Sequence, residues 1–157
     1  MDVETTFKVQ NLLARYIDAL DDDKLEDWPE FFTEECRYLV TTADNREQGL
    51  PLGMIYATSR AMLRDRVRSL RDANVYEGQR YRHMIGPPVL EPGEGGLVSA
   101  RTNFMVVRTM HTGESILFAS GRYEDRIVLA GAEARRFAEK IVVLDSRQID
   151  TLLAIPL

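Results

Sequence analysis

Three side chains of this sequence could bind a transition metal through nitrogen or sulfur: Cys36, His83 and His111. Iron and zinc centres need several histidine, cysteine or carboxylate ligands that meet at one point. One cysteine and two histidines are too few for an iron–sulfur cluster with mixed ligands. A site of two histidines and one carboxylate would need His83, in a predicted strand, to meet His111, in a predicted turn beside Thr112-Gly113. We therefore expect this chain to bind no metal and no cofactor.

Acid–base chemistry is the catalytic option that remains. A carboxyl or imidazole group among apolar walls can have a pKa near neutrality. The candidates are Tyr16, Asp21, Asp22, His83, Asn103 and Asp125. Structural explanations compete with catalysis: Tyr16 lies on an apolar helix stripe, residues 21–23 resemble solvated acids that end a helix, and Asp125 can pair with Arg122 or Arg126. For His83 we favour a structural or interface role.

Composition narrows the possible functions further. A net charge of -5 argues against nucleic acid as a partner. The glycine-containing segment from Pro92 to Gly96 joins two predicted strands and opens no helix, so it is no phosphate-binding loop. A single cysteine excludes an internal disulfide, and Cys36 in an alternating aromatic strand is expected to be a small core residue.

The N-terminal third predicts a helix, a short aromatic helix and a strand. The apolar positions of the first helix recur at helical spacing, at Val9, Leu12, Leu13, Tyr16, Ile17 and Leu20. Three aspartates, residues 21–23, then break the helix, and Leu25, Trp28, Phe31 and Phe32 follow at helical spacing around Pro29. Beyond them Cys36, Tyr38 and Val40 alternate with other residues, which indicates a strand. This order predicts helices that cover a curved sheet.

A second helix is predicted from about Ser59 to Asp72, with Ser59 as its N-cap. Its apolar stripe is expected to be Met62, Leu63, Val67 and Leu70. Its other face carries five arginines, Arg60, Arg64, Arg66, Arg68 and Arg71. Such a face is most often solvated, but arginine is also enriched at protein interfaces, so this helix is a candidate for docking a partner.

The chain from Arg80 onward predicts an antiparallel meander. Pro87-Pro88 interrupts the first strand, and glycine-containing turns near residues 93–96, 111–113 and 130–132 separate the later ones. In the strand from Leu97 to Met110 neither face is purely polar, so we expect both to be covered. In the next strand Leu117, Ala119, Gly121, Tyr123 and Ile127 are expected to share a face, with a bulge at Gly121. In the last strand Phe137, Ile141 and Val143 are expected to share a face.

The predicted fold class is α+β: a single cone-shaped domain over residues 1–157, in which N-terminal helices pack on the concave face of a curved, mostly antiparallel sheet. A chain of 157 residues is long enough to form one stable core. No apolar run approaches the length of a membrane span, and Asp2 and Glu4 stand where a secretory signal would have basic and then apolar residues. We therefore expect a cytoplasmic protein without membrane contact.

Several segments in order carry a family resemblance. They are DDDKLEDWPEFFTEECRYLV, SRAMLRDRVRSLRDA, RYRHMIGPPVL, FASGRYEDRIVL and RRFAEKIVVLDSRQIDTLL. Together they resemble the small, or beta, subunit of aromatic-ring-hydroxylating oxygenases, over nearly the whole chain. The resemblance implies the cone fold of nuclear transport factor 2 and ketosteroid isomerase. The RYRHMIGPP segment looks most like members that act on aromatic acids such as anthranilate, salicylate or terephthalate.

The resemblance also implies cofactors and partners. In this family a Rieske [2Fe-2S] cluster and a mononuclear iron sit in a separate alpha subunit, and beta subunits form a trimeric base beneath it. The chain would then be a non-catalytic structural subunit of a dioxygenase or monooxygenase of aromatic catabolism, in an alpha3beta3 assembly. We assign subunit contacts to Arg80, Tyr81, Arg82, His83, Arg64 and Arg68. Arg80 and Arg82 alternate with Tyr81 and His83, which predicts a basic and aromatic edge on both sides of that strand.

Two other hypotheses stay open. The first is a stand-alone isomerase or dehydratase of the same cone fold. In such an enzyme Tyr16, Asp22, His83 and Asn103 would converge in a deep pocket and carry the acid–base chemistry. The second is a ligand-binding or dimerisation module.

Overall fold

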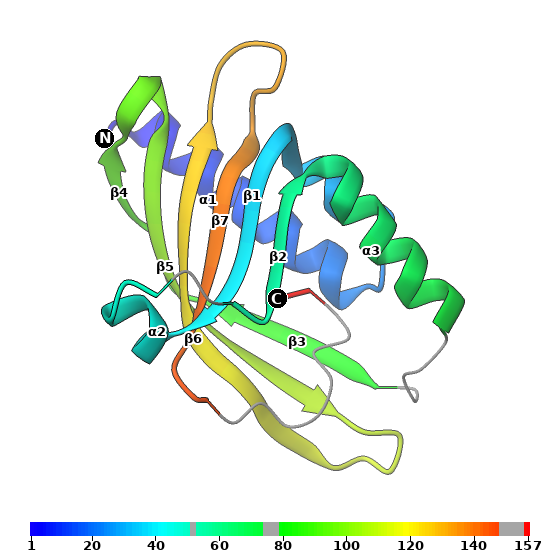
Figure 1. The fold of residues 1–157 in the computed structure, drawn as a ribbon. Helices are drawn as coiled ribbons and strands as arrows, with labels where there is room; N and C mark the ends of the chain where they lie inside the picture. Colours follow the sequence, from blue (N-terminus) through cyan, green and yellow to red (C-terminus); the bar gives the residue numbers. More distant parts are fainter. Residues whose placement is uncertain (51–52, 74–78, 148–155) are drawn as a thin grey trace.

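The described residues form a curved sheet with its long N-terminal helix on the inner side (Figure 1). The structure, a computed structural model, describes residues 1–157 except 51–52, 74–78 and 148–155. The helices are α1 (Val3–Asp21), the 3-10 helix η1 (Trp28–Phe31), α2 (Ala43–Glu47), α3 (Arg60–Ala73) and the 3-10 helix η2 (Glu94–Gly96). The strands are β1 (Phe32–Thr42), β2 (Ile55–Ser59), β3 (Arg80–Ile85), β4 (Val89–Pro92), β5 (Val98–Thr109), β6 (Ser115–Val128) and β7 (Arg136–Leu144). The predicted α+β cone is confirmed.

The sheet is mixed in direction. Its strands lie in the order β2-β1-β7-β6-β5-β3, and β4 pairs with β5 beside β3. The pair β1–β7 is parallel and the other pairs are antiparallel. The C-terminal meander β5–β6–β7 is therefore as predicted. Its last strand, β7, pairs with the N-terminal strand β1. Pro87-Pro88 separates β3 from β4, also as predicted.

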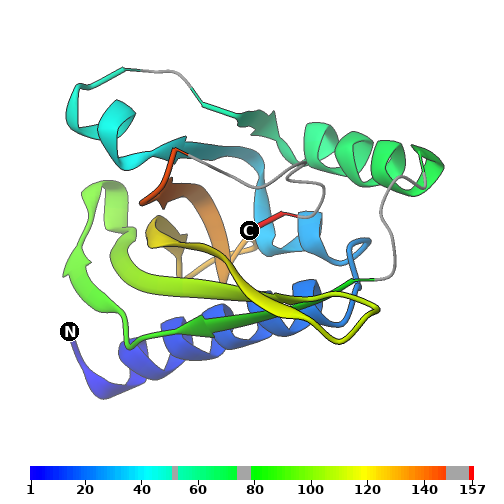
Figure 2. The same cartoon turned by 90° about the horizontal axis from the view of Figure 1, so that it is seen from below.

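Helix α1 lies across the concave side of the sheet, where its apolar stripe is buried (Figure 2). The buried residues are Val9, Leu12, Leu13, Tyr16, Ala19 and Leu20. Asp2 caps the start of the helix, since its carboxylate accepts a hydrogen bond from the Thr5 backbone N–H. The helix ends at Asp21, and Asp23 has a positive φ of 58°. Helical periodicity alone thus predicted this element and its buried face.

The second predicted helix is α3, which contacts η1, β1 and β2. The hydroxyl of Ser59 accepts a hydrogen bond from the Met62 backbone N–H, so the predicted N-cap is confirmed. Leu63 and Val67 are buried and Leu70 is half-buried. Met62 was wrongly placed on the buried stripe: it is 42% exposed, and its sulfur lies beside Thr58.

Two bulges change which residues share a face of the sheet. A register shift between Val106 and Val107 leaves Phe118 as an extra residue on β6, so Leu117 points outward instead of sharing the face of Ala119. The predicted bulge at Gly121 is therefore wrong. Gly121 instead allows close approach of β7, because a methyl group there would overlap the carbonyl oxygen of Val143.

The second bulge lies in β7. A register shift between Arg126 and Ile127 leaves Ala138 as the extra residue, so Phe137 faces the concave core while Ile141 and Val143 face the other way. The predicted face of Phe137, Ile141 and Val143 is wrong for this reason, since alternation by two residues fails across a bulge.

The described residues leave the outer face of β5 uncovered. Val98, Ala100, Thr102, Phe104 and Val106 are buried on the concave side, whereas Arg101, Asn103 and Met105 are exposed. The expectation that both faces are covered is met on the concave side, and cover for the outer face stays a prediction. Short helix α2 covers only part of this outer surface, where Ala43 packs on Leu39, Ile141 and Val143.

None of the helices formed by the described residues is long and apolar enough to cross a membrane.

Candidate functional site

The concave interior of the cone, where an enzyme of this shape would need a pocket, is filled by aromatic side chains. Tyr16, Trp28, Phe32, Tyr38, Tyr123 and Phe137 are all fully buried. Their rings meet mostly edge to face, and Phe104 stacks on Tyr123 with centroids 4.4 Å apart. The sequence brings them together because α1, η1, β1, β6 and β7 each contribute to the concave side.

The last residue of the sequence, Leu157, completes this filling. It is 1% exposed, and Figure 2 shows the end of the chain inside the curve of the sheet. Its carbonyl oxygen accepts hydrogen bonds from the Tyr16 hydroxyl at 2.9 Å and the Tyr38 hydroxyl at 3.2 Å. The indole N–H of Trp28 donates to the Tyr16 hydroxyl at 3.1 Å. These buried hydroxyls therefore hold the chain's own backbone.

An ion pair lies beneath the aromatic residues. Lys140 Nζ lies 2.9 Å from Asp125 Oδ1 and 3.1 Å from Oδ2, and both side chains are completely buried. The ammonium group also lies over the rings of Tyr16, Tyr123 and Phe137, with distances of 3.8–4.6 Å to the centroids. Asp125 therefore pairs with Lys140, not with the predicted Arg122 or Arg126. Lys140 was not predicted in the interior, since a lysine in an alternating strand gives no signal for burial.

Burial dominates the protonation equilibria of this interior. Burial raises the pKa of Asp125 to about 6 and lowers the pKa of Lys140. The charge of each partner acts in the opposite direction, because it stabilises the ionised form of the other. Burial raises the pKa of Tyr16 and Tyr123 well above the ordinary value and also raises that of Tyr38. Burial raises the pKa of the Cys36 thiol to about 11, which fits the predicted core residue and not a nucleophile.

His83 is held in a second buried pair at the end of α1. Its Nδ1 lies 2.6 Å from Asp21 Oδ1, and its backbone N–H donates to Asp21 Oδ2 at 2.9 Å. Their side chains are 1% and 5% exposed. Asp21 is thus not the solvated helix-ending acid that we expected. The pair ties the end of α1 to strand β3.

The six acid–base candidates do not meet at one point. Asp22 is exposed at the C-cap of α1. Asn103 is exposed on the outer face of the sheet, where Arg122 Nε lies 3.5 Å from its side-chain oxygen. Tyr16, Asp125 and His83 lie inside the cone, each bound to protein groups. The described residues thus offer buried structural contacts rather than an open catalytic pocket.

The metal-ligand types are separated in the structure. No group of three or more His, Cys, Asp or Glu side chains with the arrangement of a metal site occurs among the described residues. His111 is exposed in the β5–β6 turn, whereas His83 is buried against Asp21. These residues do not fit a cysteine–histidine iron–sulfur cluster or a two-histidine iron site.

The residues assigned to subunit contacts divide into two groups. Arg80 and Arg82 are exposed on the outer face of β3, but Tyr81 and His83 are buried inside this chain, so the basic and aromatic edge is present on one side of the strand only. On α3, Arg64 pairs with Glu30 at 2.6 Å and Arg68 lies 3.5 Å from Asp65. Arg64 and Arg68 stay half or more exposed.

The described residues thus form a cone-shaped α+β protein whose interior is filled by its own side chains. The family described as ring hydroxylating beta subunit matches residues 15–151. The chain therefore belongs to the beta subunits of aromatic-ring-hydroxylating dioxygenases.

Individual relatives agree with this assignment. The chain is 47% identical over 144 residues to subunit beta 2 of the terminal oxygenase component of terephthalate 1,2-dioxygenase from Comamonas sp., covering 92% of this chain and 93% of that protein. It is 41% identical over 156 residues to the anthranilate 1,2-dioxygenase small subunit of Burkholderia cepacia, covering 99% and 96%. A crystal structure assigned to an aromatic-ring-hydroxylating dioxygenase beta subunit of Novosphingobium aromaticivorans matches with a TM-score of 0.88, 37% identity, and coverage of 98% and 97%.

Proposed function

We propose that this chain is the non-catalytic beta subunit of a Rieske-type aromatic-ring-hydroxylating oxygenase and that residues 1–157 act as one domain. The observation that carries the proposal is the filled cone: the hydroxyls of Tyr16 and Tyr38 bind the backbone of Leu157 in the buried interior. The Rieske cluster and the mononuclear iron then belong to a separate alpha subunit. This division of roles fits a chain with one cysteine and two histidines.

The substrate class that we propose is an aromatic carboxylic acid. The supporting observation is that two relatives above 40% identity are named for terephthalate and anthranilate. The substrate would bind to the alpha subunit and would not contact this chain. The similarity of this chain to its relatives would then reflect the common ancestry of the whole enzymes. We also propose that the complex acts in the cytoplasm.

We propose that beta subunits associate as a trimer within an alpha3beta3 complex. The support is the uncovered outer face of the sheet, where Met84, Met105 and Leu117 are 46–63% exposed. The register pairs Met84 with Met105, and exposed Arg80 and Arg82 lie along the same strand as Met84. An apolar patch with arginines at its border is typical of a protein interface, and closed cyclic symmetry would cover it without open-ended assembly.

Light scattering of the isolated chain tests the trimer. We expect a mass of about 54 kDa, three times the 17.9 kDa of one chain. Arg82→Ala should weaken association, by about 2–5 kcal/mol if its contact is buried and by under about 1 kcal/mol if it is exposed. A clean monomer at micromolar concentration would contradict the trimer.

Reconstitution tests the function. The alpha subunit, this chain, and the two together would be assayed for iron content and for turnover of terephthalate and anthranilate. We expect iron and turnover to follow the alpha subunit, and this chain to raise the yield of active complex without carrying iron. Stoichiometric iron in this chain alone would refute the proposal. The isomerase alternative gains no support from the structure, because Asp22 and Asn103 are exposed whereas Tyr16 and His83 are buried.

A further inference from the structure

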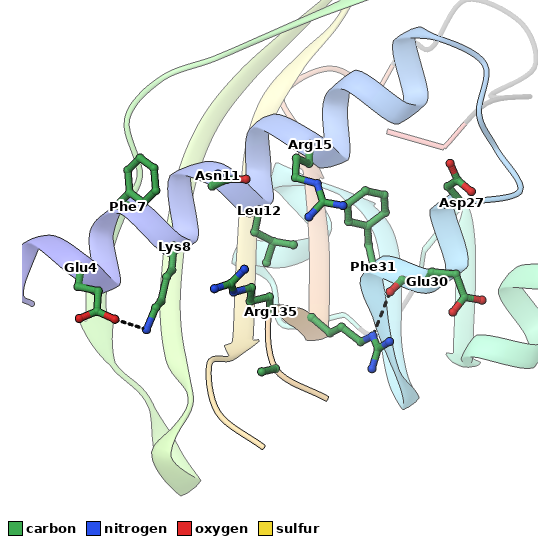
Figure 3. A pocket seen from close by; sticks show the side chains of 12 residues that line it. Glu4, Phe7, Lys8, Asn11, Leu12, Arg15, Asp27, Glu30, Phe31 and Arg135 are labelled. Atoms are coloured by element: carbon green, nitrogen blue, oxygen red, sulfur yellow. Dashed lines mark hydrogen bonds and ion pairs between the residues drawn. The ribbon is translucent and has the colours of Figure 1, made fainter. Parts of the chain in front are cut away.

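An open groove lies between α1, η1 and the hairpin that joins β6 to β7 (Figure 3). Its volume is about 620 Å³, and it lies outside the filled interior of the cone. The residues that define it are Lys8, Leu12 and Arg15 of α1, Phe31 of η1, and Arg135 and Arg136 of the hairpin side. None of the functional assignments above uses this groove.

One wall of the groove is a stripe along α1. Residues 4, 7, 8, 11, 12 and 15 line it, which is helical spacing along a single side of the helix. Lys8 is paired with Glu4 at 2.6 Å, so its charge is already balanced. Arg15 is exposed, and in the described part of the chain no hydrogen bond or ion pair reaches its guanidinium group.

The opposite wall is a hairpin that is fixed on both sides of Arg135. The Glu133 carboxylate accepts hydrogen bonds from the Glu34 backbone N–H at 3.2 Å and from Arg60 at 2.9 Å. Arg136 Nε donates to the Glu30 carbonyl oxygen at 3.1 Å. Arg135 lies between these anchors, and its guanidinium group has no partner among the described residues.

Arg135 also has an unfavourable backbone conformation. Its φ is 62°, in the left-handed region that side chains other than glycine seldom adopt. Its backbone N–H donates to the Val128 carbonyl oxygen at 2.7 Å, which closes the hairpin. An arginine that is held in a strained conformation by fixed neighbours, with its charge unused, points to a role outside the chain.

The remaining surface of the groove combines apolar and aromatic groups. Leu12 is buried at its floor and Phe31 is half-buried beside it. Phe7 stands at its edge with 64% of its surface exposed, and Val3, one turn earlier on α1, is 86% exposed. Exposed aromatic residues next to arginines are the composition of energetically important interface sites.

We propose that this groove docks a short acidic segment of the alpha subunit, with carboxylates on Arg15 and Arg135 and an apolar side chain against Phe7 and Phe31. Guanidinium groups bind carboxylates through two parallel hydrogen bonds. The charges favour an anion, because Glu4 and Glu30 are already paired and two arginines remain against the single acid Asp27. This inference depends on the proposed function.

The length of the groove fits a peptide segment. Glu4 and Arg15 are eleven positions apart on α1, which corresponds to roughly 17 Å of helix. An extended segment of about five residues would cover this distance. A small aromatic acid would cover only part of it and would leave Phe7 exposed.

Reversing the charges of Arg15 and Arg135 tests the docking groove without testing the proposed function itself. Arg15→Glu and Arg135→Glu would each be mixed with the alpha subunit, and the dissociation constant would be measured at low and at physiological salt. We expect each reversal to weaken binding by about tenfold or more at low salt and to reduce the salt dependence. Circular dichroism and the mass of the isolated chain should not change, because neither arginine has a partner within the described chain.

The matched control is Arg147→Glu. Arg147 is 80% exposed and lies beside Asp44 of α2, on the outer side of the sheet. Its reversal should leave binding within about twofold of the native value. If Arg15→Glu and Arg135→Glu bind the alpha subunit with native affinity, the inference is wrong while the proposed function stands. Native binding that is lost on adding terephthalate alone would identify a small-molecule site instead and would also overturn the inference.

Discussion

Lys140 and Asp125 place two opposite charges in the least hydrated part of the protein. Both are completely buried, and the shifts of their two pKa values show that the cost of removing each charge from water exceeds the attraction between them. The aromatic rings around Lys140 Nζ recover part of this cost. The pair therefore contributes little to the free energy of unfolding, and its main effect is to favour one arrangement of the core.

Single and double replacements of this pair test how much it contributes to the free energy of unfolding. Lys140→Met alone should lower the free energy of unfolding by about 3–5 kcal/mol, because Asp125 would stay buried without its partner. The double variant Lys140→Met with Asp125→Leu should be as stable as the native chain or more stable by about 1–4 kcal/mol. Urea denaturation measures both values. A double variant less stable than Lys140→Met would contradict this account.

The same double variant gives a pH test. Burial raises the pKa of Asp125 from 3.8 to about 6, so the folded chain binds this proton more tightly than the unfolded chain does. The stabilising contribution of the group is then complete below pH 3.8 and is lost as the pH rises toward about 6. The stability of the native chain relative to the double variant should therefore fall between these values. A difference that rises with pH in this window would show that the pKa is lowered instead.

His83 tests structure against catalysis at a single residue. His83→Ala would leave the Asp21 carboxylate in a buried position without the imidazole that binds it. We expect a loss of about 2–4 kcal/mol in the free energy of unfolding. Turnover per assembled oxygenase complex should stay near normal. A variant that assembles fully but has no activity would contradict the structural role of His83.

Gly121 controls the spacing of strands β6 and β7 at the scale of an element. A methyl group at this position would overlap the Val143 carbonyl oxygen and approach Leu144 Cα at 3.1 Å. Gly121→Ala should therefore cost at least about 3 kcal/mol of stability. Gly86→Ala is the matched control, because its nearest neighbour, the Asn103 carbonyl oxygen, would be 4.0 Å away. It should stay within about 0.5 kcal/mol of the native chain. Equal stability of the two variants would contradict the close approach.

Elements with strong periodicity were predictable from the sequence, and elements with bulges were not. The stripe of α1 and the Ser59 cap of α3 depend on local spacing and local hydrogen bonds, which a sequence shows directly. The extra residues Phe118 and Ala138 reverse the alternation of β6 and β7, and nothing local marks them. The parallel pairing of β1 with β7 joins residues about a hundred positions apart, which alternation alone cannot predict.

The interior site was predictable only in part for the same reason. Tyr16 and Cys36 were expected in the core, and both are buried there. Lys140 was not expected in the interior, because a lysine is usually exposed, and no local pattern placed Leu157 there. Their positions depend on partners from other elements: Asp125 on β6 and the hydroxyls of Tyr16 and Tyr38.

At the scale of the whole molecule, the described surfaces divide into three regions with different roles. The concave side is filled by aromatic residues and Leu157. The outer face of the sheet leaves Met84, Met105 and Leu117 exposed for the proposed contacts between copies. The groove beside α1 carries Arg15 and Arg135 for the proposed contact with the alpha subunit. A protein with this arrangement would act through binding surfaces rather than through a pocket.

Sedimentation velocity of this chain with a purified alpha subunit tests that claim most directly. Both components would be followed at once, this chain by a fluorescent label and the alpha subunit by the visible absorbance of its iron–sulfur cluster. We predict that all cluster absorbance and all labelled chain move in one boundary at equal stoichiometry, and that this chain without its label has no visible absorbance. Two separate boundaries at micromolar concentration, or cluster absorbance that moves with this chain alone, would contradict the account.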